Sequence, residues 1–376
     1  MTPIAPNELL DEFSRHGLSF FAGVPDSTLQ GFGSALESRI GRQRHVVAAN
    51  EGNAVALAAG WYLATGRLGV VYLQNSGLGN AVNPLLSLTN RSVYRIPLLM
   101  LIGWRGAPGQ PDEPQHAAQG RLTPGLLDAL EIEYSVIDPT RWRDQLAAAV
   151  KAALGDEQPR ALLFSPGTLG KRPSSQPGQG LMRRQEVLEA LVGELGPRDI
   201  VVSTTGKTSR ELFEIRQARG QSHATDFLTV GSMGHTASIA LGLALGCERT
   251  VWCVDGDGSA LMHLGSLAVT AQTAAANLRY ILINNGAHES VGGQKTVGLE
   301  VDFPGILSGA GFQGVSLVRT RDELAPALRR LRAQTGGALV AEVAVGSRAD
   351  LGRPSVTPLE SRTELMALLD SDRAVP

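Results

Sequence analysis

Cysteine is scarce in this chain. Only Cys247 and Cys253 occur, too few for a disulfide framework or a cysteine-rich metal site. Cys253 lies in the apolar run 251–254, where we expect a buried, unreactive thiol. This cysteine usage is typical of proteins from a reducing compartment.

Long apolar runs are also absent. No stretch reaches the roughly 18 apolar residues that a membrane-spanning helix needs. The first residues show no basic segment followed by an apolar one, which a secretory signal would require. We therefore expect a cytoplasmic protein with no membrane partner.

Neither sign of charge is in excess. The formal net charge is −2, and no basic stripe of the kind that nucleic-acid binding needs is present. We therefore expect a small-molecule partner and no nucleic acid. Apolar residues make up 43% of the chain and charged residues 19%, which is typical of a globular protein. The 376 residues suit two domains, each with its own core.

Short apolar runs alternate with helical patterns in both halves of the chain. This alternation predicts parallel sheets covered by helices on both faces, and hence an α/β fold with two doubly wound domains. The segment 166–180 is rich in Pro, Gly, Ser and Gln, so we expect domains over 1–166 and 183–376 with a linker over 167–182. Strands are predicted over 18–22, 45–49, 69–74, 97–102, 160–165, 199–204, 227–230, 250–255, 280–284, 315–318 and 338–343, and helices over 53–65, 236–245 and 321–333.

Polar residues follow two of the predicted strands in the second half. The segment Gly256-Asp257-Gly258-Ser259 follows one strand, and Asn284-Asn285 closes the next. Because carboxyl ends of neighbouring parallel strands lie side by side, Asp257 and Asn285 can converge on one ion. With a backbone carbonyl near Ala287 they would supply the oxygen ligands that Mg²⁺ takes. The glycines would let a diphosphate approach the backbone. The alternative is a tight turn in which Asp257 only caps a helix.

This pattern resembles the cofactor-binding signature of the thiamin diphosphate enzyme superfamily, a Gly-Asp-Gly segment followed by paired asparagines. The resemblance implies that Asp257, Asn285 and the Ala287 carbonyl hold Mg²⁺. It further implies that Gly256, Gly258 and Ser259 seat the diphosphate of the cofactor.

Another part of the resemblance is the segment Gly231-Ser232-Met233-Gly234, which precedes an alanine-rich helix. The family places a bulky apolar side chain beneath the cofactor, and Met233 matches it. The Gly231 carbonyl would accept from the aminopyrimidine amino group. As an alternative, Met233 is an ordinary core side chain.

Glu51 opens the corresponding helix of the first half, in Glu51-Gly52-Asn53. It resembles the carboxyl group that these enzymes hydrogen-bond to the aminopyrimidine ring. The alternative is a helix N-terminal glutamate favoured by the helix dipole. The resemblance implies that Glu51 acts on a cofactor bound by another subunit, so we expect the chain to pair with itself in a homodimer or larger assembly.

The absence of a middle domain separates this chain from the large pyruvate decarboxylases. The segments 23–27, 50–54 and 74–80 resemble the phosphonopyruvate and sulfopyruvate decarboxylases, and 103–106, 112–116 and 205–211 favour the phosphonopyruvate branch. The resemblance implies decarboxylation of 3-phosphonopyruvate to phosphonoacetaldehyde and CO₂ in phosphonate natural-product biosynthesis. Alternatives are a sulfopyruvate decarboxylase, another thiamin diphosphate-dependent lyase or ligase, and a non-catalytic nucleotide-binding module.

A small anionic 2-oxo acid needs cations, neutral donors and groups that exchange protons. The alternative for Arg105, Lys207 and Lys295 is that each is an exposed loop cation with no part in substrate binding. Asp26 could equally cap a turn, and His116 could lie in an exposed polar loop. The segment 286–296 contains three glycines, and we expect it to form a mobile cover. The candidate substrate ligands are Ser27, Asn75, Ser76, Arg105, Lys207, Gly292, Gly293 and Lys295, and the candidate proton carriers are Asp26, His116 and His288.

Overall fold

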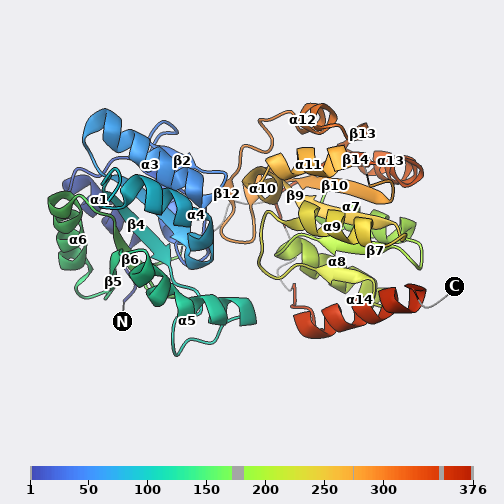
Figure 1. Cartoon of the computed structure of the whole chain (residues 1–376), viewed down its shortest axis with the longest axis horizontal. Helices are drawn as coiled ribbons and strands as arrows, with labels where there is room; N and C mark the ends of the chain where they lie inside the picture. The colour runs from blue at the N-terminus through green and yellow to red at the C-terminus, as the bar shows by residue number, and fades with distance from the viewer. Residues whose placement is uncertain (1, 172–181, 274, 347–350, 374–376) are drawn as a thin grey trace. The chain divides into compact units, whose positions relative to one another are not determined.

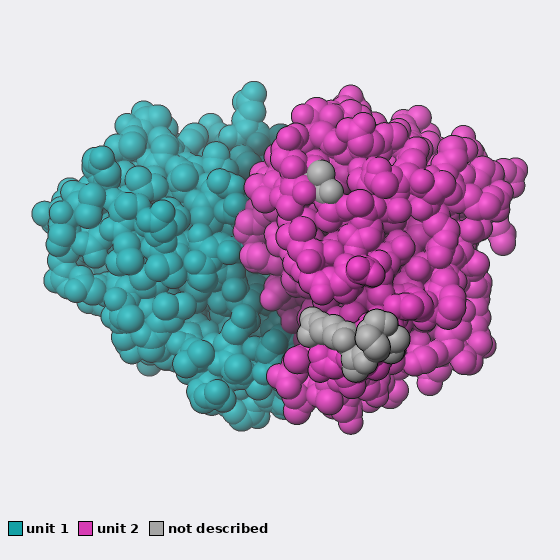
Figure 2. Space-filling model, turned by 45° about the vertical axis from the view of Figure 1, so that its right-hand side comes forward, with its two compact units in different colours: residues 1–174, 291–294 teal, residues 175–290, 295–376 magenta. Residues whose placement is uncertain are grey.

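The computed structural model describes residues 2–171, 182–273, 275–346 and 351–373. The chain forms two compact units, residues 1–174 with 291–294 and residues 175–290 with 295–376 (Figure 2). The linker predicted over 167–182 falls largely on 172–181, outside the described residues, and it stays a prediction. Each unit is described by itself.

The first unit is built on a six-stranded parallel sheet with the strand order β2-β1-β3-β4-β6-β5 (Figure 1). Neighbouring residues of β3 point to opposite faces: Tyr72 joins one apolar core with α1, α2 and α6, and Leu73 joins the other with α3, α4 and α5. The elements are α1 (Pro6–Arg15), β1 (Phe21–Gly23), α2 (Gln30–Arg39), β2 (His45–Val47), α3 (Glu51–Thr65), β3 (Gly69–Gln74), the 3₁₀ turn η1 (Asn75–Gly77), α4 (Leu78–Pro84), the π turn η2 (Leu85–Thr89), β4 (Leu98–Gly103), α5 (Pro114–Ala129), β5 (Glu133–Val136), α6 (Trp142–Asp156) and β6 (Arg160–Phe164).

The second unit contains another six-stranded parallel sheet, of order β13-β14-β10-β9-β7-β8 (Figure 1). Its faces are again covered by two apolar cores, one with α7, α8 and α13 and one with α9 to α12 and α14. The elements are α7 (Arg184–Glu194), β7 (Ile200–Ser203), α8 (Lys207–Ala218), β8 (Asp226–Leu228), α9 (Thr236–Gly246), β9 (Val251–Gly256), α10 (Asp257–Met262), α11 (Gly265–Thr273), β10 (Leu278–Asn284), β11 (Ala287–His288), β12 (Gln294–Lys295), α12 (Phe303–Ala310), β13 (Gln313–Val318), α13 (Arg321–Ala333), β14 (Gly337–Glu342) and α14 (Pro358–Arg373).

The two large sheets share one topology. Numbered along the chain within its own unit, and leaving out the two-residue strands β11 and β12, each sheet has the order 2-1-3-4-6-5. Such identity is the expected result of duplication followed by divergence. It means that β1 to β4 in the first unit correspond to β7 to β10 in the second.

The predicted fold class is confirmed, and every predicted strand overlaps an observed one. Strand β5 was missed because it lies at the sheet edge with three of its four residues exposed, so it lacks an apolar run. Cys253 is buried as predicted, and burial raises the pKa of its thiol. No helix in the described ranges has the length and apolar content needed to cross a membrane.

Candidate active site

The predicted site residues follow corresponding strands in the two units. The carboxyl ends of parallel strands share one edge of a sheet, where α/β proteins bind ligands. Asp26 follows β1, Glu51 follows β2, Asn75 follows β3 and Arg105 follows β4, while Lys207 follows β7, Gly231 to Gly234 follow β8, Asp257 follows β9 and Asn285 follows β10.

Glu51 is a buried carboxyl group at the first residue of α3. The residue is 5% exposed, and Oε2 accepts a 2.7 Å hydrogen bond from Asn80 Nδ2. A β carbon at Gly77 would lie 2.1 Å from Glu51 Oε1, so the missing side chain there makes room for the carboxyl group. Burial raises the pKa of Glu51, and the Asn80 hydrogen bond opposes this only in part. Such a group is suited to sharing a proton with a ring nitrogen.

Arg105 gathers several predicted substrate ligands in the first unit. Its Nη1 donates to Ser27 Oγ at 2.9 Å, and its backbone NH donates to Asn75 Oδ1 at 3.1 Å. Asn75 Nδ2 in turn donates to the Arg105 carbonyl at 3.0 Å. Asp112 holds the guanidinium with two further bonds, of 2.7 and 2.5 Å, and this ion pair keeps the pKa of Asp112 low. That Asp112 orients the Arg105 guanidinium was not predicted from the sequence.

Asp26 is buried in the segment that follows β1. Its Oδ2 accepts from the backbone NH groups of Thr28 and Leu29 at 2.9 and 3.0 Å, so the predicted turn-capping alternative describes this oxygen. Among the described residues, Oδ1 has no hydrogen-bond partner. Burial raises the pKa of Asp26 from 3.8 to about 6, despite opposing hydrogen bonds and Arg105. Such a carboxyl group exchanges protons near neutral pH.

His116 is not in a loop. It lies in the first turn of α5, which begins at Pro114, a residue preorganised for the first position of a helix.

Other candidate substrate ligands lie in exposed or glycine-rich segments. Ser76 is exposed and accepts from Gln74 Nε2 at 2.5 Å. Lys295 is exposed as well, in β12. Gly292 and Gly293 have positive φ angles of 144° and 80°. The movement predicted for segment 286–296 stays a prediction.

Asp257 and Asn285 are adjacent at the ends of β9 and β10. The Asn285 backbone NH lies 3.4 Å from Asp257 Oδ1, and the Thr296 hydroxyl donates to Oδ2. Burial raises the pKa of Asp257 from 3.8 to about 6, against these hydrogen bonds. The Asn285 carboxamide is fixed at both ends, because Oδ1 accepts from the Ala287 NH at 3.1 Å and Nδ2 donates to Glu289 at 3.0 Å.

These residues fit a divalent cation. Asp257 is a buried carboxyl group, and its hydrogen bonds from Asn285 and Thr296 come from uncharged groups, so a bound cation would stabilise its ionised form. One carboxylate, one amide oxygen and one backbone carbonyl suit Mg²⁺ that also binds phosphate and water. Within the described ranges, no three His, Cys, Asp or Glu side chains form a metal cluster.

The predicted cofactor residues of the second unit touch one another. Ser259 Oγ accepts from the Gly234 NH at 3.1 Å. A β carbon at Gly258 would lie 2.9 Å from His288 Cε1 and 3.3 Å from Met233 Cε, so these two side chains border the glycine. Burial lowers the pKa of His288 from 6.5 to about 4, which leaves a neutral imidazole at pH 7.

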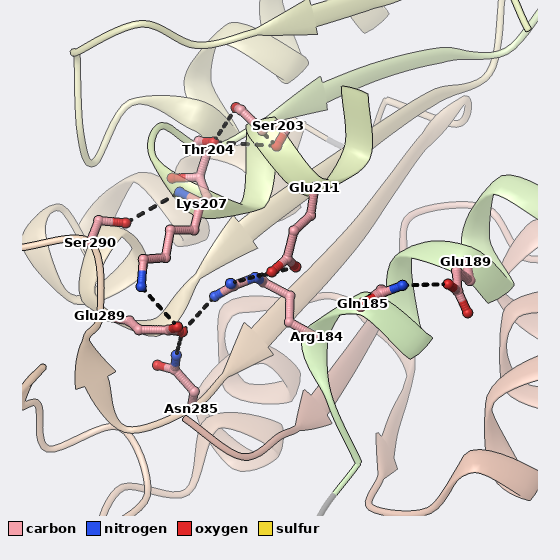
Figure 3. Close-up of polar contacts among 11 residues, drawn as sticks. Arg184, Gln185, Glu189, Ser203, Thr204, Lys207, Glu211, Asn285, Glu289 and Ser290 are labelled. Carbon is pink, nitrogen blue, oxygen red and sulfur yellow. Dashed lines mark hydrogen bonds and ion pairs between the residues drawn. The ribbon is translucent and has the colours of Figure 1, made fainter. Parts of the chain in front are cut away.

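Lys207 belongs to a cluster of charged side chains in the second unit (Figure 3). Its Nζ lies 3.2 Å from Glu289 Oε1, and its backbone NH donates to Ser290 Oγ at 3.2 Å. Arg184 pairs with Glu289 and with Glu211. Burial alone would raise the pKa of Glu289, but Arg184 and Lys207 lower it. Arg184 and Glu289 were not among the predicted site residues, although Glu289 lies only four residues after Asn285.

Comparison with known proteins gives matches across both units. Residues 7–131 match the thiamine pyrophosphate enzyme N-terminal TPP binding domain, and residues 204–343 match the C-terminal TPP binding domain. A phosphonopyruvate decarboxylase from Streptomyces viridochromogenes is 39% identical, over 95% of this chain and 93% of that protein. One from Streptomyces hygroscopicus is 37% identical, over 95% and 92%. A sulfopyruvate decarboxylase from Methanosarcina acetivorans is 31% identical, over 75% and 77%.

Proposed function

Because this chain belongs to the thiamine pyrophosphate enzymes, and among them to the phosphonopyruvate decarboxylase family, we propose that it decarboxylates 3-phosphonopyruvate. The products are phosphonoacetaldehyde and CO₂. The observation that carries the substrate assignment is the near-full-length similarity to two phosphonopyruvate decarboxylases. We also propose that the reaction takes place in the cytoplasm and that it supplies phosphonoacetaldehyde for the biosynthesis of phosphonate natural products.

Thiamin diphosphate and Mg²⁺ are the proposed cofactors. When bound, thiamin diphosphate supplies a carbon nucleophile and an electron sink for decarboxylation. Asp257, Asn285 and the Ala287 carbonyl would hold Mg²⁺, and the segment 256–259 would bind the diphosphate. The segment 231–233 would contact the aminopyrimidine, with Met233 beneath it.

Glu51 would hold a proton between its carboxyl group and a ring nitrogen of the aminopyrimidine. Its burial, its raised pKa and its hydrogen bond from Asn80 support this role. The two cofactor-binding sets lie in different units, Glu51 in one and Asp257 in the other. We propose that they meet across subunits, so that a homodimer or larger assembly is the active form.

Arg105 is the proposed principal ligand of the phosphonate. Its guanidinium is oriented by Asp112 and donates to Ser27 Oγ, while Asn75 is hydrogen-bonded to the Arg105 backbone. Ser27 and Asn75 stay candidate neutral ligands. Ser76, the Gly292 and Gly293 backbone, Lys207 and Lys295 stay candidate ligands.

A proton must replace the departing carboxylate on the substrate carbon. Asp26 is the strongest candidate donor, because it has an unpartnered buried oxygen and a pKa of about 6. His116 and His288 stay candidates for proton transfer, His288 as a neutral acceptor at pH 7.

Sulfopyruvate is the second candidate substrate. The similarity to the sulfopyruvate decarboxylase of Methanosarcina acetivorans supports it, although over a smaller part of the chain. The two acids differ mainly in the charge of the terminal group, so Arg105 would accept either.

Product formation tests the proposal. Purified chain should release CO₂ and phosphonoacetaldehyde from 3-phosphonopyruvate only when thiamin diphosphate and Mg²⁺ are both present. Glu51→Gln should lower kcat by about 10²- to 10⁴-fold, because proton transfer is lost, while calorimetry still detects thiamin diphosphate binding. Cofactor-independent turnover, or full activity of Glu51→Gln, would refute the proposal.

A further inference from the structure

Glu289 joins three polar groups from different segments of the second unit (Figure 3). Its Oε2 accepts from Asn285 Nδ2 at 3.0 Å and from Arg184 Nη1 at 2.7 Å, and its Oε1 accepts from Lys207 Nζ at 3.2 Å. The Glu289 side chain is only 7% exposed. The three donors therefore hold the nearly buried Glu289 carboxylate in a defined position.

The carboxylate determines which way the Asn285 carboxamide faces. A carboxylate between two cations is an acceptor only, so it must face the NH₂ end of the amide. The oxygen end is thereby turned to the Ala287 NH, at 3.1 Å, while the backbone NH of the same residue lies 3.4 Å from Asp257 Oδ1. A reversed carboxamide would place its oxygen against the carboxylate and its NH₂ against the Ala287 NH. Both contacts would be repulsive.

Arg184 also forms a second ion pair, with Glu211. Arg184, the first residue of α7, donates Nε and Nη2 to the two carboxylate oxygens of Glu211 on α8, both at 2.8 Å. The Arg184 and Glu211 side chains are 5% and 4% exposed. This two-pronged bond leaves Nη1 aimed at Glu289. Arg184 and Lys207 balance the charges of Glu211 and Glu289, so the cluster is neutral.

From this geometry we infer that Glu289 is a positioning residue of the divalent-cation site. It does not ligate the cation. It acts through Asn285, by fixing the carboxamide so that Oδ1 keeps one lone pair available to a metal ion while the other accepts from Ala287. The inference rests on the proposed function, because that function places Mg²⁺ at Asp257 and Asn285.

Mg²⁺ affinity tests this role apart from catalysis. In calorimetric titrations of the full chain saturated with thiamin diphosphate, Glu289→Gln should raise the Kd for Mg²⁺ by about 10- to 100-fold, as for other residues that orient a metal ligand. Glu289→Gln keeps the size of the side chain but adds an NH₂ group that competes for the same position.

Two variants separate orientation from stability. Glu211→Gln breaks the other ion pair of Arg184 without touching Asn285, so it should lower the unfolding temperature while changing the Mg²⁺ Kd by less than about threefold. Glu248→Gln removes the same charge at an exposed position after α9 and should change neither. If Glu211→Gln weakens Mg²⁺ binding as much as Glu289→Gln does, the cluster is only structural and the inference is wrong.

A double-mutant cycle supplies the last test. In an Asn285→Ala background, Glu289→Gln should change the Mg²⁺ Kd by less than about twofold, because the group through which it acts is gone. Fully additive losses would overturn the inference, as would a Glu289→Gln titration that overlays the wild-type one. A wild-type chain that binds no Mg²⁺–thiamin diphosphate would overturn the proposed function together with this inference.

Discussion

Gly77→Ala should displace the Glu51 carboxyl group without straining the backbone. Gly77 has φ −83° and ψ −7°, a right-handed helical conformation outside the positive-φ region that favours glycine. Its added β carbon, however, would lie 2.1 Å from Glu51 Oε1, 2.3 Å from Cδ and 2.5 Å from Cγ. Ordinary contact begins near 3.4 Å, so the carboxyl oxygen must retreat by about 1.3 Å. The added methyl group would therefore move the Glu51 carboxyl group, the proposed proton carrier.

A displacement of this size should lower kcat by about 100-fold, because a misplacement of 1 Å costs roughly that much in an oriented active site. The assay is steady-state CO₂ release from 3-phosphonopyruvate, with thermal unfolding recorded for each variant. Gly155→Ala in α6 is the matched control, since a β carbon there meets no atom within 4 Å. It should keep the wild-type kcat and gain up to about 1 kcal/mol of stability.

A folded Gly77→Ala variant with kcat within twofold of the wild type would show that the position of the Glu51 carboxyl group does not limit the reaction. An equal loss of kcat in Gly155→Ala would show that the assay reports general damage.

Three further substitutions test other parts of the site. Asp257→Asn should stabilise the metal-free chain by roughly 3 kcal/mol above pH 6 and hardly at pH 4. The folded pKa of Asp257 lies above the ordinary value of 3.8, so the contribution of this carboxyl group to the free energy of unfolding is lost as the pH rises through about 6. Equal unfolding temperatures of the variant and the wild type at pH 7.5 would contradict this. The same substitution should weaken Mg²⁺ binding in calorimetry. Arg105→Lys should raise the KM for 3-phosphonopyruvate about tenfold with a smaller change in kcat, because lysine lacks the fork that binds a phosphonate, and an unchanged KM would rule out this role. Gly258→Ala should weaken thiamin diphosphate binding about tenfold by pushing on His288 and Met233, as equilibrium titration would show.

Much of the fold could be predicted from local patterns. The apolar runs of the central strands are fully buried, as in β4, β9 and β10, and such runs indicate parallel sheets directly. The residues that follow these strands, Asp257 and Asn285 among them, could be located because a parallel sheet brings its strand ends to one edge.

The supporting contacts could not be predicted, because they join residues far apart in the chain. Arg184 and Glu289 are 105 positions apart, and no periodicity links them. Asp112 was noted only as part of the segment 112–116, and only the folded chain shows its paired bonds to Arg105. For His116, the polar composition of its segment outweighed the helix-start signal of Pro114.

The most direct test of the account is the comparison of kcat/KM for three acids under identical conditions, with saturating thiamin diphosphate and Mg²⁺. We predict that 3-phosphonopyruvate exceeds both sulfopyruvate and pyruvate by at least about tenfold, which corresponds to roughly 1.4 kcal/mol of transition-state discrimination. Turnover of sulfopyruvate at an equal or higher kcat/KM, or the absence of CO₂ release from 3-phosphonopyruvate, would contradict it.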